Sequence, residues 1–265
     1  MKNTLTNSMK SPDNNQHSIL QEYFKMHPLA SAVIITIVDL VFSIVIGLTA
    51  KAVFPQFEPE FVTLIALSAL VALLITTLGW WKVTGFNAPS QWREVGLVII
   101  PFTIVIILPF LMGFNKENLK SLAYLIVGYA LTGFMEEGLM RGVVLRVLKP
   151  LGITRSVVVS SLLFGFLHVT NFIFRNPFIV LAQMLGAFVH GIGLAAIRLR
   201  TNTIWFVVIL HGLHDLLLKF TNFPAIPLDV VQVTLTMIYG IYLLRTWHNH
   251  DVDTVFTDAK TVVIK

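Results

Sequence analysis

The residues best suited to chemistry lie in a hydrophobic run from Leu122 to Leu148, where Glu136, Glu137 and Arg141 introduce charge. A charged side chain at the centre of a bilayer costs about 2.5–3.5 kcal/mol on insertion scales, so such residues are usually retained for a task. Glu137 and Arg141 are four positions apart and can form an ion pair on one helix face. Glu136 points roughly 100° away from Glu137 and has no local partner. A buried carboxylate without a partner is a candidate general base.

Two later hydrophobic segments carry polar residues at helical spacing. His168 and Asn171 share a helix face with Phe164, and His211 and Asp215 are four positions apart, so both can point into one cavity. An imidazole and a carboxylate at this spacing suit metal ligation, proton transfer or stabilisation of a developing oxyanion. The alternative is that these groups only hydrogen-bond helices together, as polar residues in membrane bundles do.

The composition indicates a membrane protein. Hydrophobic residues make up 55% of the chain, charged residues make up 12%, and the mean hydropathy is +0.78. Soluble domains carry about 25% charged residues. The absence of cysteine excludes disulfides and thiolate chemistry. A net charge of +5 suits contact with anionic lipid headgroups, and nothing in the sequence indicates nucleic-acid binding.

Hydrophobic segments of about 20 residues can each cross a hydrocarbon core of roughly 30 Å. The predicted fold is therefore an all-α, polytopic integral membrane helix bundle. We expect about eight transmembrane helices, near Leu29–Phe54, Phe61–Trp81, Val95–Phe114, Leu122–Leu148, Ser156–Phe172, Pro177–Ile197, Thr203–Phe220 and Leu228–Leu244.

The distribution of basic residues predicts the topology. One side of the expected bundle holds 13 Lys and Arg residues and the other holds 5. By the positive-inside rule, both termini face the cytosol. We expect a polar cytosolic tail at 1–27, one transmembrane domain at 28–248, and a cytosolic tail at 249–265. The N-terminal tail does not resemble a cleavable signal peptide.

The polar groups on three helices are predicted to converge at one depth. Glu136 lies 13 positions before Lys149 at the cytosolic end of its segment. His168 lies 13 positions after Arg155, and His211 lies 11 positions after Arg200. At 1.5 Å per residue, each lies about 17–20 Å from that end. Scattered polar substitutions would seldom align in this way, so the alignment favours a site over separate packing contacts.

The ordered set Glu136-Glu137-x-x-x-Arg141, Phe164-x-x-x-His168 and His211-x-x-x-Asp215 resembles the CPBP family of intramembrane proteases. That family includes the CAAX prenyl endopeptidases and the bacterial Abi proteins linked to bacteriocin processing and immunity. The resemblance covers roughly residues 122–220, the motif core of the expected domain.

The resemblance implies a role for each matching position. Glu136 would activate the hydrolytic water, with Glu137 and Arg141 supporting it. His168 would bind or polarise the water. His211 and Asp215 would stabilise the oxyanion, although the family commonly has Asn where this chain has Asp215. An ionised Asp215 would repel an oxyanion, so it must be protonated, bind a metal or orient His211.

The cofactor is left open between two alternatives. Glu136, His168, His211 and Asp215 could supply a zinc site with an open position. No His-Glu-x-x-His run is present, and the resemblance favours a glutamate-activated water without metal. Three polar residues are expected to support the site from nearby: Asn171, His190 and His214. Asp39 in the first span has no assignment beyond an interhelical contact.

The predicted function is an intramembrane endopeptidase that cleaves a peptide in a cytosol-facing cavity. Its partners would be the lipid bilayer and a peptide or lipidated peptide, such as a CAAX-type tail or a bacteriocin-like precursor. The oligomeric state cannot be read from the sequence. We expect a multi-pass protein, in a bacterial plasma membrane rather than the endoplasmic reticulum.

Two rival functions use the same polar residues. The first is a non-catalytic immunity or scaffold protein in which the polar cluster only packs helices. The second is a proton-coupled transporter. The transporter is disfavoured because the chain shows no pair of Gly- or Pro-interrupted spans in corresponding halves.

Overall fold

The computed structural model describes residues 12–89, 95–114, 121–173 and 175–246. Helices dominate these residues, and one isolated β-bridge pairs Phe114 with Thr221. The α-helices are α1 (Pro12–Met26), α2 (Pro28–Val53), α3 (Pro59–Thr77), α5 (Ile99–Met112), α6 (Leu122–Glu137), α7 (Leu145–Val147), α8 (Ile153–Leu167), α9 (Pro177–Thr201), α10 (Trp205–Phe220) and α11 (Ala225–Arg245). A π-helix, Gly138–Val144, joins α6 to α7, and 3-10 helices occupy Gly96–Val98, Lys149–Leu151 and His168–Ile173.

All eight predicted hydrophobic segments are helical. Five helical segments are individually long and apolar enough to cross a membrane: Pro28–Val53, Pro59–Thr77, Ile153–Ile173, Pro177–Thr201 and Ala225–Arg245. The other three are shorter or interrupted, because Gly96–Met112 and α10 have fewer turns and the π-helix divides the run that begins at Leu122. The all-helical, multi-pass membrane architecture is thus confirmed, whereas the number eight and the cytosolic termini stay predictions.

The predicted polar N-terminal tail contains a helix that the sequence analysis missed. Helix α1 carries Ile19, Tyr23 and Met26 on exposed positions, while Phe24 is buried and packs edge-on against Trp80, 5.8 Å between ring centroids. Apolar residues every three to four positions are typical of an amphipathic helix. The predicted C-terminal tail, 249–265, lies outside the described residues.

The exterior of the described bundle is apolar. Large apolar side chains cover it; Leu73, Leu111 and Leu185, for example, are each more than half exposed. The interior is also largely apolar, but it contains charged groups, and Glu137 and Arg141 are at most 1% exposed. An apolar exterior with charged residues confined to the interior is the arrangement expected of a protein surrounded by lipid.

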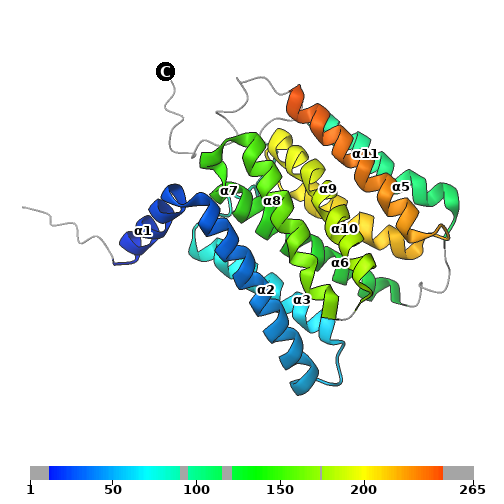
Figure 1. Ribbon diagram of the computed structural model, residues 1–265, viewed down its shortest axis with the longest axis horizontal. Helices are drawn as coiled ribbons and strands as arrows, with labels where there is room; N and C mark the ends of the chain where they lie inside the picture. The colour runs from blue at the N-terminus through cyan, green and yellow to red at the C-terminus, as the bar shows by residue number, and fades with distance from the viewer. Residues whose placement is uncertain (1–11, 90–94, 115–120, 174, 247–265) are drawn as a thin grey trace, which may run out of the picture.

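The helices of the bundle pack around two apolar cores (Figure 1). Helices α2 and α3 lie at one end, α5 and α11 lie at the other, and α6, α8, α9 and α10 run between them. One apolar core joins α2, α3 and α8 to the run from α6 to α7, and another joins α5, α9, α10 and α11. Phe86 packs against both cores.

A close crossing of α6 and α10 joins the two cores. A Cβ atom built on Gly133 would lie 2.5 Å from the Val208 carbonyl oxygen, and one built on Gly212 would lie 2.9 Å from the Tyr129 carbonyl oxygen. Small residues permit such close approach of backbones in membrane bundles. The crossing brings the turn after Gly133, which carries Glu136 and Glu137, beside the turn that carries His211.

The π-helix continues α6 through the core. All seven of its residues, Gly138–Val144, are buried, and Arg141 lies at its centre. Single π turns inside α-helices often mark functional sites because they redirect the side chains that follow. Here the π-helix places Arg141 beside α8 and α9 instead of facing lipid.

The α6–α10 crossing can be tested with two alanine substitutions in one helix. Gly133→Ala should lower the thermal unfolding midpoint, because the added methyl group meets the backbone of α10. Gly128→Ala is the control, since a Cβ there meets nothing within 4 Å. Both substitutions gain about 1 kcal/mol of helix propensity. Equal midpoints for the two variants in detergent would contradict the crossing.

Candidate active site

His211 lies at the centre of the site and faces three carboxylates. Its Nδ1 is 2.8 Å from Oε1 of Glu137, a hydrogen bond in which the ring N–H donates. Its Nε2 is 3.7 Å from Oε2 of Glu136 and 3.6 Å from Oδ2 of Asp215. The short bond to Glu137 sets the orientation of the ring. The Nε2 side is left facing the two carboxylates at distances too long for direct hydrogen bonds.

Glu137 joins His211 to Arg141. While Oε1 accepts from His211, Oε2 lies 3.2 Å from Nε of Arg141, and both side chains of this ion pair are 0% exposed. The i,i+4 pair predicted from the sequence is therefore present. The Arg141 guanidinium also stacks on the ring of Phe164, with 4.1 Å from Cζ to the ring centroid.

Glu136 differs from Glu137 in accessibility. Its side chain is 18% exposed, whereas that of Glu137 is fully buried. Glu136 has no partner on its own helix, as predicted, but it faces His211 across the interface with α10. The charge of Glu136 also interacts with His168 and Asp215. A small molecule such as water can therefore approach Glu136, but not Glu137.

His168 lies where α8 ends and the 3-10 helix His168–Ile173 begins. Its Nδ1 donates to the carbonyl oxygen of Phe164 over 3.1 Å, which leaves Nε2 free to contact a ligand. The ring of Phe164 lies edge-on to both His168 and His211, at centroid distances of 5.4 and 5.9 Å. Phe164 thus packs against Arg141 and both histidines, a central position that the sequence analysis did not assign to it.

Asn171, a predicted supporting residue, is directed to another helix. Its Nδ2 donates to Oε1 of Gln183 on α9 over 2.8 Å. The bond connects the 3-10 helix that begins at His168 to α9. A supporting role of Asn171 in the site stays a prediction.

The other two predicted supporting residues form a cluster next to His211. His190 on α9 is 4% exposed, and its ring centroid lies 4.8 Å from that of His214 and 5.8 Å from that of His211. Nε2 of His214 lies 3.0 Å from Oδ1 of Asp229 on α11. Asp229 was missed, although an acidic residue near the start of a hydrophobic segment was the available signal.

Asp39 has a place near the site. It lies on α2, and its charge interacts with that of Glu136. Acidic residues from α2, α6 and α10 therefore surround the Glu136 side of the cluster. The sequence offered no spacing rule that links position 39 to position 136, so this proximity could not be predicted.

The zinc alternative involves Glu136, His168, His211 and Asp215. Within the part of the chain that the structure describes, no group of three or more His, Cys, Asp or Glu side chains is arranged to hold a metal ion. Nδ1 of His211 is hydrogen-bonded to Glu137, and Nδ1 of His168 is bonded to its own helix, so Nε2 of each ring is the atom that would contact a metal or a water molecule. The requirement for zinc stays a prediction.

These features define a multi-pass, all-helical membrane protein with an acid–histidine–arginine cluster in its interior. Residues 118–217 match the family described as type II CAAX prenyl endopeptidase, Rce1-like. The match confirms the resemblance to the CPBP/CAAX family of proteases, and it spans the segment that carries the three motifs. No curated protein and no solved structure matches the chain significantly.

Removal of Arg141 tests the central ion pair. Arg141→Ala should destabilise the folded protein by about 3 kcal/mol, because it leaves a buried carboxylate without its cation. The loss should appear as a lower unfolding midpoint and lower yield from membranes. Arg245→Ala, at an exposed position on α11, is the control. An Arg141→Ala protein as stable as the parent would contradict a structural role for the pair.

Proposed function

We propose that the protein is an intramembrane endopeptidase of the CAAX type in which Glu136 activates the hydrolytic water. The proposal rests on the different burial and contacts of two adjacent glutamates. Glu137 is fully buried between Arg141 and His211, whereas Glu136 is partly exposed and faces Nε2 of the same histidine. Glu137 therefore orients His211, whereas the carboxylate of Glu136 remains available to react with water.

The proposed reaction begins with a water molecule held near Glu136 and His168. Glu136 removes a proton from the water as its oxygen attacks the peptide carbonyl carbon. The negative charge that develops on the carbonyl oxygen is stabilised by the N–H of a protonated His211 at Nε2. Glu136 then returns the proton to the leaving amine as the carbon–nitrogen bond breaks, which completes hydrolysis and restores the carboxylate.

Asp215 takes part through His211 in this scheme. Its Oδ2 is 3.6 Å from Nε2, and its side chain is 27% exposed. A carboxylate at that distance attracts the protonated ring and helps to keep the N–H aimed at the carbonyl oxygen. Of the three alternatives for Asp215, we therefore propose orientation of His211.

A membrane-anchored peptide is the proposed substrate. The site lies among helices whose outer surfaces are apolar, so a substrate that is itself held in the bilayer reaches it without leaving the lipid. A CAAX-type tail and a bacteriocin-like precursor both have this character when lipidated or hydrophobic. We further propose that the site around Glu136 opens to the cytosol, in keeping with the positive-inside topology.

Replacement of Glu136 tests the reaction. Glu136→Gln keeps the shape of the side chain but removes the base, so peptide cleavage should fall by at least about 100-fold. The measurement compares small-peptide and lipoprotein products of cells that express the parent or the variant at matched levels. Glu60→Gln, at an exposed position on α3, is the control for the loss of one carboxylate.

The same experiment separates the protease from its rival. In a non-catalytic immunity or scaffold protein, an isosteric amide in the packing cluster would leave the products unchanged and any partner-dependent phenotype intact. A precursor that accumulates with Glu136→Gln but not with Glu60→Gln would identify the substrate and exclude the rival.

Metal removal tests the proposed mechanism independently. We expect cleavage by purified protein to continue at an unchanged rate after treatment with a strong chelator, because no step is assigned to a metal. Metal content would be measured on the same sample. A chelated protein that loses activity and regains it with added zinc would contradict the proposal.

A further inference from the structure

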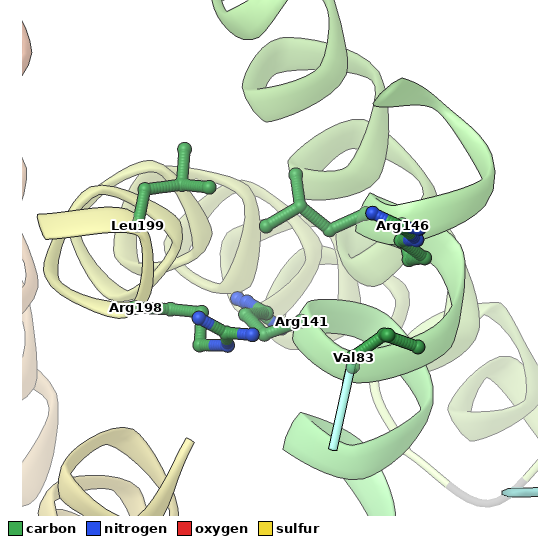
Figure 2. Close-up of a pocket in the computed structure, with 7 residues that line it drawn as sticks. Val83, Arg141, Arg146, Arg198 and Leu199 are labelled. Carbon is green, nitrogen blue, oxygen red and sulfur yellow. The ribbon is translucent and has the colours of Figure 1, made fainter. Parts of the chain in front are cut away.

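A small cavity next to the candidate site is lined by three arginines, Arg141, Arg146 and Arg198, and otherwise by a glycine and three aliphatic side chains (Figure 2). Its volume is about 10 Å³. That is room for roughly one water-sized occupant. Figure 2 shows Arg198 reaching from α9 toward Arg141 of the π-helix.

The lining offers positive charge and many hydrogen-bond donors but no acidic side chain. A guanidinium group only donates hydrogen bonds, because it has no acceptor. Guanidinium groups around one cavity repel one another, although Glu137 offsets part of this charge by its ion pair with Arg141. The chemistry of the lining therefore favours an anionic occupant.

Arg198 is the member of the set with the least compensation. It is 5% exposed, and its guanidinium donates to neutral oxygens: Nε to the Thr84 carbonyl over 3.3 Å and Nη1 to Oδ1 of Asn202 over 3.5 Å. Among the residues that the structure describes, no carboxylate forms an ion pair with it. A buried charge is normally paired.

Arg141, which also lines the cavity, has buried donors without a hydrogen-bond partner. Its Nε faces Glu137, but Nη1 and Nη2 are buried and have no hydrogen-bond partner among the described residues. Buried donors of this kind are rare in native proteins and usually mark an absent water or ion. Both terminal nitrogens belong to a side chain that is 1% exposed.

The backbone next to Arg198 is shaped to accept its guanidinium. Gly85 has φ +98°, a conformation that other residues rarely adopt, and a Cβ atom built there would overlap the guanidinium. The loop after α3 therefore holds Arg198 in the cavity instead of letting it extend to solvent. The position of the positive charge is built into the fold.

We propose that this cavity binds one small monovalent anion, for which chloride is the probe. An anion accepts hydrogen bonds from several guanidinium groups at once, whereas a water molecule brings two further donors beside side chains that offer no acceptor. The bound anion stabilises the junction of the π-helix with α9, one helical turn from Glu137.

The test measures the thermal unfolding midpoint of the purified full-length protein in detergent, in sodium chloride and in sodium gluconate at equal ionic strength. Equal ionic strength removes general screening from the comparison. Chloride should raise the midpoint by roughly 2–4 °C with saturation, because an anion that binds only the folded state stabilises it. Bromide should replace chloride and give anomalous scattering in the cavity of a crystal.

Three variants connect the effect to the cavity. Arg198→Gln should abolish the difference between chloride and gluconate, and Arg245→Gln, at an exposed position, should keep it. If Arg198→Gln does not fold, Arg146→Gln serves in its place. Equal midpoints of the parent protein in both salts, or a chloride effect that persists in the cavity variant, would show that the cavity holds water only and would overturn the proposal.

Discussion

The buried carboxylate of Glu137 connects the parts of the interior on which the site depends. One oxygen accepts from His211 on α10, and the other faces Arg141 of the π-helix, whose guanidinium lies on Phe164 of α8. Three helices are thereby tied together by groups that are almost fully buried. In a low-dielectric interior, each of these charges would be costly alone, so the arrangement is stable only as a unit.

The need for Glu137, His211 and Arg141 to meet explains how the surrounding helices pack. Glu137 reaches His211 because α6 and α10 cross with their backbones almost in contact at Gly133 and Gly212. The π-helix that follows directs Arg141 inward, and the outer faces of the same helices carry apolar side chains. Between helices in lipid, close packing and internal hydrogen bonds replace the hydrophobic effect as the source of stability.

The same unit divides the interior into two chemical environments. On the Glu136 side, Glu136 of α6 and Asp215 of α10 face the outer nitrogen of His211, and the charge of Asp39 on α2 acts on Glu136. On the opposite end of Arg141, three arginines line a cavity that contains no acid. The Glu137–Arg141 pair lies between the acidic region and the region where positive charge accumulates. The match to the CAAX family of proteases covers the acidic residues that lie on α6 and α10.

Composition and spacing alone determined the membrane class, the helical segments and the local pairs Glu137–Arg141 and His211–Asp215, because period and hydrophobicity are local properties of a chain. The depth argument also brought Glu136 and His211 to one level. Only the tertiary structure decided that His211 places a different nitrogen against each glutamate and that Phe164 packs between Arg141 and the histidines. It also decided that Asn171 bonds to Gln183, and that Asp39 and Asp229 lie near the cluster. These contacts depend on how helices rotate and cross, which is set by backbone approach at glycines and by the π-helix. A single sequence carries no distance information between residues on different helices, so such contacts lie beyond what periodicity can predict.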